Sequence, residues 1–381
     1  RQMQKNEIYV IQGKEYKAMT LQILEKSRLE ELIPAKDACI GIKPNLVSPS
    51  PASYGATTHP EVVKGIVEYL QQRGFRNLVI LEGSWVGDRT AEAVKVCGYD
   101  RLCQKYGIEF WDTQKEKGIQ KDCAGMSLKI CRCVEKLDFL INVPVWKGHC
   151  QTKITCALKN LKGLIPNSEK RRFHSLGLHK PIAHLNGGIR QDFIVVDHIC
   201  GDLDFEDGGN PVVCDQILTA RDPVLCDAYV CEKMHYRQEE VPYIQLAQSL
   251  GVGSADLTTL SVQECQTGRE DRELPRERKI VHVQDAVEEV ESCSACYGYL
   301  IPALDQLREE GFLEKLKEKI CIGQGFRGKK GNLGIGQCTR EFTHSLEGCP
   351  PTENQIYEFL KAYILEKDKE EIQCQKDQKK Q

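Results

Sequence analysis

Short apolar runs alternate with amphipathic stretches over the first part of the chain. Three of these runs predict strands: residues 7–12, 38–42 and 77–81. Residues 17–32 and 61–72 have the apolar spacing of helices, and Thr58-His59-Pro60-Glu61 has the spacing of a capping box before the second of them. Strands that alternate with helices predict a Rossmann-like α/β fold, in which helices flank a mostly parallel sheet.

The pattern changes toward the end of the chain and predicts a second, smaller unit. Residues 268–279 are almost all polar and carry both signs of charge, which is typical of a linker. They would separate an α/β domain at 1–267 from a cysteine-rich α/β unit at 280–365, where strand and helix patterns return. Residues 366–381 form a charged tail that we expect to be frayed.

Composition narrows the class of protein. The longest apolar runs, such as 139–143, fall far short of the roughly 18 residues that cross a bilayer, so we expect no membrane span. Lys and Arg number 52 against 55 Asp and Glu, and a net charge of -3 makes nucleic acid an unexpected partner. Residues 1–16 show no apolar signal segment, and 19 cysteines in 381 residues suit a reducing compartment. We therefore expect a cytoplasmic protein.

Charge reverses sharply in the middle of the chain. Residues 147–190 hold nine Lys or Arg side chains against one acid, and residues 192–232 hold ten acids against one base. A solvated surface explains a single run of charge better than it explains a reversal between neighbouring segments. Because lysine supplies a point charge and carboxylates hold hard cations, the pattern favours a small anionic substrate or a phosphate bridged by a divalent metal.

Histidines gather in the same region and add candidate acid–base chemistry. Five of the nine lie there: His149, His174, His179, His184 and His198. Scattered surface histidines are the alternative, because none has the tight spacing of a metal-binding motif. The catalytic candidates are the residues that follow the predicted strand at 139–143 most closely: Lys147, His149 and Lys159. Lys162 is a further candidate ligand of the substrate.

The acidic segment contains a glycine-rich turn at 201–211. Its alternating Asp residues are similar to a calcium loop, but the glutamate at the twelfth position and the flanking helices are missing. A turn that presents acidic and amide side chains to the basic segment is the better interpretation. Its candidate substrate ligands are Asp202, Glu206 and Asn210, and a divalent metal among them stays open.

The cysteines near the end of the chain give the sharpest chemical signal. Cys293 and Cys296 form a Cys-x2-Cys pair. Cys338 lies among glycines, and a proline directly follows Cys349, as in bacterial iron–sulfur sequences. We predict a [4Fe-4S] cluster on these four cysteines, with structural zinc or plain buried thiols as alternatives. Cys321 lies in an apolar strand and is the weakest of the five candidates.

Residues 323–328 match the Gly-x-Gly-x-x-Gly pattern after a predicted strand. A dinucleotide-binding motif requires a helix next, whereas this sequence continues with Lys329-Lys330-Gly331-Asn332. We interpret the loop as one that encloses a cluster or cradles an anion. A further group of cysteines offers a second, disfavoured metal site: Cys131, Cys133, Cys150 and Cys156.

Several motifs occur in an order that resembles a known family. They are Lys43-Pro44-Asn45-Leu46, Thr57-Thr58-His59-Pro60, the loop around Gly83, Lys147 with His149, residues 157–163 and the block 197–211. Over residues 38–250 the chain resembles the bacterial and archaeal family catalogued as domain of unknown function 362, which is often associated with iron–sulfur proteins. The resemblance implies an α/β fold whose motif loops line one cleft. It also implies substrate-binding roles for motif residues: Lys43, Asn45, His59, Glu82 and Ser84.

The chain departs from this family in its cysteines. Many members carry a ferredoxin-like tail with two compact four-cysteine runs, whereas the cysteines here are dispersed through another unit. A ferredoxin module is therefore not expected. The family name supplies no reaction.

The combined patterns predict an iron–sulfur oxidoreductase that acts on a small anionic substrate. The lysines and His149 would bind or protonate the substrate, and the cluster would exchange electrons with a redox partner protein. If only three cysteines bind the cluster, the open iron would act as a Lewis acid, and the protein would be a lyase or dehydratase. Outside the enzyme class, the alternatives are a non-catalytic electron carrier and a zinc-containing binding protein.

Overall fold

The structure is a computed structural model that describes residues 1–266 and 268–378. Its internal contacts divide the chain into two compact units, Arg1–Glu277 and Arg278–Gln381. The boundary lies inside the polar segment 268–279, which the sequence pattern predicts to be a linker.

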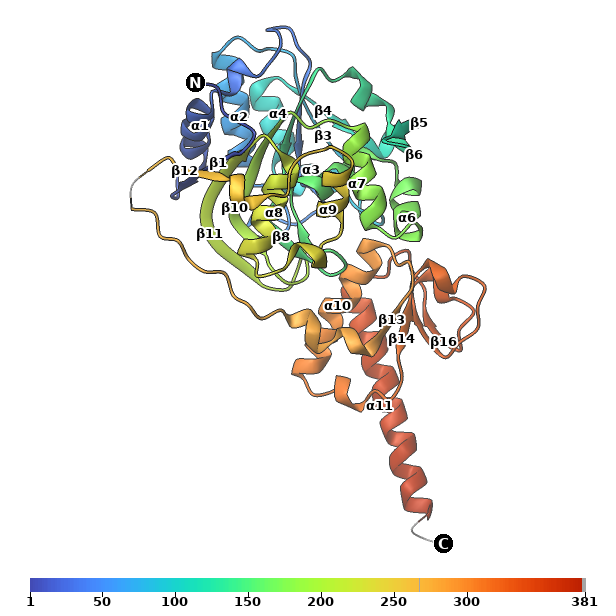
Figure 1. The fold of residues 1–381 in the computed structure, drawn as a ribbon. Helices are drawn as coiled ribbons and strands as arrows, with labels where there is room; N and C mark the ends of the chain where they lie inside the picture. The colour runs from blue at the N-terminus through green and yellow to red at the C-terminus, as the bar shows by residue number, and fades with distance from the viewer. Residues whose placement is uncertain (267, 379–381) are drawn as a thin grey trace. The chain divides into compact units, whose positions relative to one another are not determined.

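An eight-stranded sheet forms the centre of the first unit (Figure 1). Its strands are β1 (Glu7–Gln12), β2 (Ile40–Pro44), β3 (Leu78–Glu82), β4 (Glu109–Asp112), β7 (Phe139–Val143), β10 (Phe193–Asp202), β11 (Pro211–Ala220) and β12 (Ser261–Glu264). They lie in the order β12-β1-β11-β10-β7-β2-β3-β4. β11 runs antiparallel to β1 and β10, and the other neighbouring pairs are parallel. The predicted mostly parallel α/β sheet is confirmed.

Helices flank this sheet: α1 (Tyr16–Ser27), α2 (Pro60–Gln72), α3 (Thr90–Val96), α4 (Tyr99–Tyr106), α5 (Ala157–Asn160), α6 (Asn167–Ser175), α7 (His179–Gly188), α8 (Pro223–Lys233) and α9 (Tyr243–Ser249). One apolar core joins the sheet to α1, α2 and α4, through side chains such as Ile23 and Val63. A second core joins it to α5, α7, α8 and α9, through Leu158 and Val230 among others. β2, β3, β7 and β10 are buried along their whole length, as parallel strands covered on both faces are.

Two antiparallel hairpins stand outside the main sheet: β5 (Gly118–Cys123) with β6 (Met126–Cys131), and β8 (Lys147–His149) with β9 (Lys153–Thr155). The second hairpin follows β7 and begins the basic segment. It starts just after Val145, which forms a parallel bridge with Asp197 of β10. The basic segment is therefore attached to the sheet beyond the end of β7 and beside the middle of β10.

The second unit contains short strands and two longer helices: β13 (Val287–Glu289), β14 (Ile320–Ile322), β15 (Leu333–Ile335), β16 (His344–Leu346), α10 (Ser294–Glu309) and α11 (Glu353–Gln378). The strands form one parallel sheet in the order β13-β14-β15-β16, and α10 contacts α11. After β14 and β15 the chain turns at Gly323 and Gly336, whose φ angles of 122° and 89° favour glycine. The predicted smaller α/β unit is thus present.

The last helix is longer than the sequence pattern predicts. A helix is expected at 354–363 with a frayed tail from residue 366, whereas α11 continues to Gln378. The tail is rich in helix-forming residues and lacks Gly and Pro, and Lys367 pairs with Glu370 at 2.9 Å one turn along. Residues 379–381 lie outside the described part of the chain.

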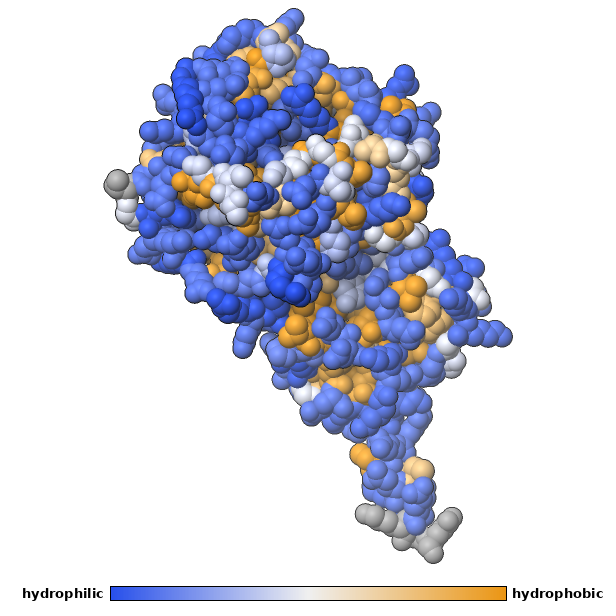
Figure 2. All heavy atoms as spheres, viewed as in Figure 1, coloured by the Kyte–Doolittle hydropathy of each residue, from blue (hydrophilic) through white to orange (hydrophobic). Residues whose placement is uncertain are grey.

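A helix that crosses a bilayer must be both long and apolar. Across residues 1–266 and 268–378, no helix combines the necessary length with sufficient apolar character. α11 has 26 residues but is rich in charge. The visible face of the molecule is mostly hydrophilic (Figure 2).

Candidate functional site

Lysine side chains gather in the interior of the first unit, around the ends of parallel strands. Four of them expose 6% or less of their surface: Lys43, Lys147, Lys159 and Lys170. Lys43 lies near the end of β2, and the Lys170 ammonium donates to the carbonyls of Gly83 and Ser84, directly after β3. A fully buried lysine is rare unless it is paired. We call these four residues, together with Glu82, Glu206 and His149, the lysine site.

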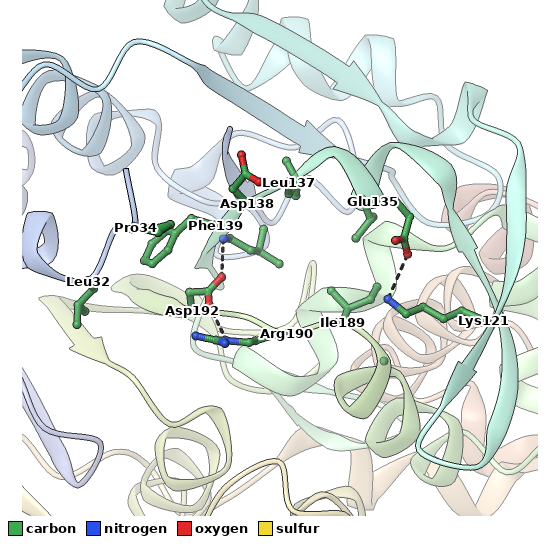
Figure 3. A pocket seen from close by; sticks show the side chains of 13 residues that line it. Leu32, Pro34, Lys121, Glu135, Leu137, Asp138, Phe139, Ile189, Arg190 and Asp192 are labelled. Atoms are coloured by element: carbon green, nitrogen blue, oxygen red, sulfur yellow. Dashed lines mark hydrogen bonds and ion pairs between the residues drawn. The ribbon is translucent and has the colours of Figure 1, made fainter. Parts of the chain in front are cut away.

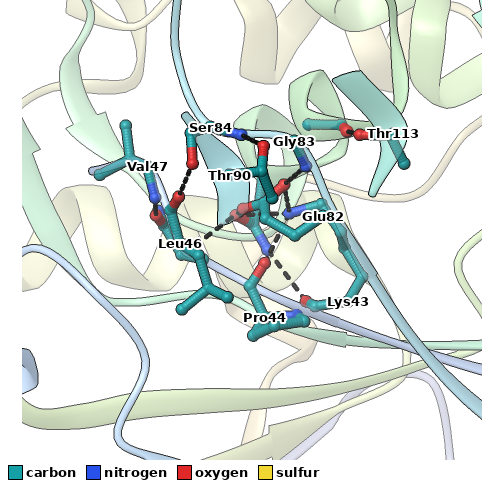
Figure 4. A network of polar contacts seen from close by, with 12 residues as sticks. Lys43, Pro44, Leu46, Val47, Glu82, Gly83, Ser84, Thr90 and Thr113 are labelled. Carbon is teal, nitrogen blue, oxygen red and sulfur yellow. Dashed lines mark hydrogen bonds and ion pairs between the residues drawn. The ribbon is translucent and has the colours of Figure 1, made fainter. Parts of the chain in front are cut away.

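Lys43 and Glu82 form a buried ion pair between the ends of β2 and β3 (Figure 4). The Lys43 Nζ lies 2.8 Å from the Glu82 Oε1 and donates to the Pro44 carbonyl at 2.6 Å. The Glu82 carboxylate also accepts hydrogen bonds from the backbone N–H groups of Leu46 and Gly83, both at 2.8 Å. These contacts hold the ends of β2 and β3 together. The pair formed by Lys43 and Glu82 is therefore a structural part of the site.

Glu206 is the second carboxylate of the site and faces two basic side chains. Its Oε1 lies 3.3 Å from the Lys147 Nζ, and its Oε2 lies 2.9 Å from the His149 Nε2. Lys147 also donates to the Ala56 carbonyl at 2.7 Å. The His149 Nδ1 accepts from the N–H groups that follow it in the hairpin turn, so its proton resides on Nε2, toward Glu206.

The turn after β10 holds Glu206 in place. Asp202 accepts hydrogen bonds from four backbone N–H groups of this turn, those of residues 204, 205, 209 and 210. The Ser48 hydroxyl donates to Asp207 at 2.9 Å and ties the turn to the loop after β2. Glu206 itself has a φ of 78°, an unusual value for a residue other than glycine. Asp202 thus organises the turn, and Glu206 is the residue that reaches the lysines.

Lys159 differs from the other buried lysines. It is 6% exposed, and within the described residues its ammonium has neither a hydrogen-bond partner nor an ion-pair partner. Burial lowers its pKa; the Glu206 charge opposes this shift and Lys147 reinforces it. Close by, the Lys162 Nζ lies 3.1 Å from the His174 Nε2, and burial together with Lys162 holds the His174 pKa well below its usual range. The site therefore carries more positive than negative charge.

The protonation states follow from burial and from neighbouring charges. Burial opposes ionisation of Glu206, but Lys147, Lys159 and His149 outweigh it and hold its pKa well below the usual range. Burial and the Lys159 charge lower the pKa of His149 to about 4, so its ring is neutral at pH 7. Burial lowers the pKa of Lys170 to about 8. Near neutral pH the site thus combines an ionised Glu206, a neutral imidazole and ammonium groups with a lowered pKa, among them those of Lys159 and Lys170.

Other residues predicted from the sequence surround these groups. The Asn45 Oδ1 accepts from the Val47 N–H at 3.0 Å, and the Ser84 hydroxyl donates to the Leu46 carbonyl at 2.7 Å, beside Lys43 and Glu82. The Asn210 carbonyl accepts from Leu203 within the Glu206 turn.

His59 lies apart from the lysines. Its Nδ1 is 2.9 Å from the Asp197 carboxylate, and its backbone N–H donates to the same oxygen at 2.7 Å. Burial opposes protonation of this ring, but Asp197 outweighs it and raises the pKa. His179, His184 and His198 also have partners away from the lysine site: Tyr243, the Cys123 carbonyl and Gln216, respectively.

Lys170 and Asn160 belong to the site but are not among the residues predicted from the sequence. Lys170 precedes two arginines, and charge alone does not distinguish the three. Helical spacing offers a signal, because Lys170 shares the buried face of α6 with Phe173 and His174 at i+3 and i+4. The Asn160 amide donates to the Lys43 carbonyl at 3.3 Å, a contact that depends on the fold.

A cavity of about 390 Å³ opens at the other edge of the same sheet (Figure 3). It is lined by residues before and at the start of β7, such as Asp138, and by Asp192 before β10. Lys121 pairs with Glu135 there, and Arg190 pairs with Asp192. Since α/β sheets bind ligands at the carboxyl ends of their strands, the lysine site is the stronger candidate.

The four predicted ligand cysteines lie at one edge of the small sheet in the second unit. Cys293 caps α10 and Cys296 lies in its first turn, while Cys338 and Cys349 follow β15 and β16. Burial raises the Cys296 pKa, and the charges of the other three thiols raise it further, which places all four near one another. The Arg327 Nε donates to the Cys338 sulfur at 3.4 Å.

The spacing of these sulfurs distinguishes between kinds of metal centre. Zinc–thiolate bonds of about 2.3 Å would place the sulfurs of a mononuclear site about 3.8 Å apart. Among the described residues, no three of the four cysteines offer sulfurs within 4.8 Å of one another. As described, these sulfurs therefore lack the close spacing of a mononuclear zinc site. Cys321 lies in β14, where its sulfur contacts Glu288 at 3.8 Å.

One tighter group of donors occurs in the first unit. Cys156, Cys226 and Asp227 place their ligand atoms within 4.8 Å of one another, and all three are buried. The Asp227 carboxylate, however, accepts from the N–H groups of Ala157 and Leu158 at 2.8 and 3.0 Å, at the start of α5. This group is therefore explained by helix capping.

Comparisons with known proteins identify a family and, beyond it, distant likenesses. A family described as "Domain of unknown function (DUF362)" matches residues 40–232. The thylakoid-associated protein sll1697 of Synechocystis sp. is 25% identical over 138 residues, which make up 35% of this chain and 41% of that protein. The chain thus covers less than half of this curated relative.

The similarity to a solved structure is also distant. The lactate racemase apoprotein from Thermoanaerobacterium thermosaccharolyticum has 16% sequence identity and a TM-score of 0.36, over 51% of each chain. Both values are too low to support an argument about function.

Proposed function

The chain belongs to the DUF362 family, and on this premise we propose that it is an iron–sulfur protein that binds a small anion at the lysine site and transfers electrons to or from it. Family membership agrees with the resemblance of the sequence motifs. It names no reaction, so the proposal rests on the two sites.

The unpartnered ammonium of Lys159 carries the proposal. Burial of a charge is costly unless a counter-charge compensates it. Lys43 and Lys147 each have a carboxylate within 3.3 Å, whereas Lys159 has none within ion-pair distance in the described part of the chain. A carboxylate or phosphate group of a substrate would supply the missing charge. The excess of positive charge around Lys159 favours such an anion.

The neighbours of Lys159 suggest separate roles. Lys147 is held by Glu206 and the Ala56 carbonyl, so it would contribute fixed positive charge. Lys159 has a lowered pKa and no competing partner, which suits a group that contacts the substrate and passes a proton to it. His149 would face Glu206 as a neutral ring and leave the Glu206 charge to the lysines.

The second unit would supply the electrons. Cys293, Cys296, Cys338 and Cys349 would hold a [4Fe-4S] cluster, a one-electron carrier. The N-terminus of α10 and the Arg327 guanidinium would stabilise its negative charge. If only three of the cysteines bind iron, the reaction would instead be a Lewis-acid elimination. A redox partner protein would be needed only if the cluster transfers electrons, and not for the elimination reaction.

The cluster is tested by anaerobic purification, with visible absorption and with iron, sulfide and zinc measured per chain. We expect a broad band at about 400 nm and about four irons with four sulfides. Cys349→Ser should lose this iron, and Cys321→Ser, the matched control in β14, should keep it. A colourless protein with one zinc would contradict the redox proposal. Iron retained in Cys349→Ser would favour the elimination reaction.

The anion site is tested by calorimetric titration with inorganic phosphate and with malonate. The unmodified chain should bind at least one of them, and Lys159→Met should weaken binding about tenfold or more, since a buried charge contact is lost. Lys180→Met, at an exposed lysine of α7, is the control. Equal affinity in Lys159→Met, or no binding by the unmodified chain, would refute the role of Lys159. Anions with a reducible group that compete with phosphate or malonate for the site are then tested as oxidants of the reduced protein, by recovery of the visible band.

A further inference from the structure

A second cavity of the first unit, about 460 Å³ in volume, lies between β10, β11 and α8. Trp146, His198, Gln216, Tyr229 and Arg269 are among the residues that line it. Trp146 precedes Lys147 in the chain, but the two side chains have different surroundings. Lys147 contacts Ala56 and Glu206, whereas Trp146 contacts His198 and Tyr229. This cavity is therefore separate from the lysine site.

Aromatic rings form one wall of the cavity. The rings of Trp146 and His198 stack with centroids 3.7 Å apart and planes 9° from parallel. Tyr229 meets Trp146 edge-on, with centroids 6.0 Å apart. A volume of this size accommodates a single ring with a small substituent, and such walls are typical of sites for planar ligands.

Two polar atoms in this wall lack partners. The Trp146 Nε1 and the His198 Nε2 are buried and, among the described residues, have no hydrogen-bond partner. Their side chains are only 2% and 3% exposed. Buried polar groups are nearly always satisfied in native proteins, so these two atoms indicate a missing partner.

The two atoms differ in hydrogen-bonding character. The Trp146 Nε1 carries a proton and can only donate. The His198 Nδ1 lies 3.3 Å from the Gln216 Oε1, so the proton of the ring resides on Nδ1 and Nε2 is an acceptor. Burial lowers the His198 pKa to about 4, which leaves the ring neutral at pH 7. The two stacked rings thus carry one unused donor, on Trp146, and one unused acceptor, on His198.

The charged side chains of the cavity compensate one another. Lys233 lies 3.6 Å from Asp271, and Arg269 lies 3.1 Å from Glu264 and 3.8 Å from Asp271. Three basic and three acidic side chains line the cavity in all: Lys233, Arg269, Arg272, Glu232, Asp271 and Glu273. An ionic ligand would have no unmatched charge to meet there.

We propose that this cavity binds a small, uncharged, planar ligand that carries a hydrogen-bond acceptor beside a donor, of the aromatic carboxamide class. The carboxamide oxygen accepts from the Trp146 N–H, and the carboxamide N–H donates to the His198 Nε2. The ring of the ligand fills the rest of the cavity. Nothing in this assignment depends on the anion or the cluster of the proposed function.

The test titrates the full chain with benzamide and with benzoate, by ligand-observed NMR. Benzoate has the same shape but is charged and lacks the N–H donor. Benzamide should bind the unmodified chain more tightly than benzoate does. Trp146→Phe keeps a ring but removes the donor, and it should weaken benzamide binding about five- to tenfold, the loss expected for one buried hydrogen bond. Trp111→Phe and Lys159→Met should leave benzamide binding unchanged.

Two outcomes would overturn the proposal. One is that benzamide fails to bind the unmodified chain, and the other is that it binds Trp146→Phe equally well. Either result would mean that a carboxamide does not use these two ring nitrogens. If Trp146→Phe does not fold, His198→Phe removes the acceptor instead and should weaken benzamide binding by a similar factor. Unchanged binding in a folded His198→Phe would equally overturn the proposal.

Discussion

At the level of single residues, the first unit keeps four ammonium groups largely away from water. Lys43 and Lys147 face carboxylates, and Lys170 donates to two backbone carbonyls. Lys159 has no such partner in the described part of the chain. The Lys159 side chain is largely buried, and burial of its charge opposes folding. In the function proposed above, a bound anion would compensate the Lys159 charge.

Replacement of Lys159 should show this conflict between function and stability. Lys159→Met removes the unpartnered charge and keeps most of the side-chain volume, so the free energy of unfolding should rise by roughly 1–3 kcal/mol. Phosphate should stabilise the unmodified chain and not the variant. Urea unfolding with and without phosphate measures both effects. Lys180→Met is the exposed control. A less stable Lys159→Met would mean that attraction to Glu206 outweighs the cost of burial.

At the level of elements, close approach of the backbone positions the site. Gly163 follows α5 and packs on the ion pair between β2 and β3. A Cβ at this position would lie 1.8 Å from the Glu82 Oε1 and 2.7 Å from the Lys43 Cε. The distances leave no room for a side chain, so the two strand ends and the basic segment fit together only with glycine here.

Gly163→Ala should accordingly break the pair between Lys43 and Glu82. We expect a loss of roughly 3–5 kcal/mol in the free energy of unfolding, the range for disruption of a buried ion pair. Gly74→Ala is the control, because its φ of 84° strains alanine while its Cβ would meet open space. That strain should cost about 1 kcal/mol. Urea unfolding of both variants tests the difference, and equal losses would show that the ion pair adapts.

In the small sheet of the second unit, the same kind of turn follows two strands. β14 and β15 each end in a glycine turn, and the second of these turns leads to Cys338. The corresponding position after β14 is Gly325, and Arg327 of that turn donates to Cys338 instead. The dispersed cysteines are thus brought to one edge by short parallel strands.

Gly336→Ala should disturb this edge. Its Cβ would lie 3.1 Å from the Cys296 sulfur, on a backbone with a φ of 89°. If the edge holds a cluster, iron per chain should fall by half or more. Gly328→Ala has a similarly strained φ of 72° but open space around its Cβ, and it should retain iron. Equal iron content in the two variants would contradict a cluster in contact with this turn.

At the level of the whole molecule, buried histidines make the fold sensitive to acid. Burial lowers the pKa values of His149, His179 and His198 to about 4. In the unfolded chain these rings titrate near 6.5, so between pH 6.5 and 4 the unfolded state binds more protons. Stability should therefore fall as the pH is lowered through this range.

His198 allows the acid effect to be measured for one residue. Between pH 7 and pH 5 a ring with this shift loses about 2 kcal/mol of stabilisation. His198→Phe should reduce the pH dependence of unfolding by about that amount, because phenylalanine does not titrate. Phe193→Leu in β10 should lower stability equally at both pH values. An unchanged pH dependence in His198→Phe would mean that the ring titrates in the folded protein as it does in the unfolded chain.

The sequence by itself determined the class of fold and the family. Alternating strand and helix periods require a parallel sheet with helices on its faces, since each period buries one apolar face. The ordered motifs from Lys43 to the turn at 201–211 carried the resemblance that the family match confirmed. Both properties are local, so they can be recognised without coordinates. The prediction of a frayed tail after residue 365 was wrong, because residues with high helix propensity continue α11 through Gln378.

Only the tertiary structure decided which of these residues act on one another. Lys43 meets Glu82, and Lys147 meets Glu206, across strands that are distant in the chain. The same folding leaves Lys159 without a partner among the described residues and leaves the ring nitrogens of Trp146 and His198 unsatisfied. Pairing depends on distance in space and on burial, and neither is encoded in the local pattern of residue types. The sequence could therefore predict where charged residues cluster, but not which of them has no ion-pair partner among the described residues.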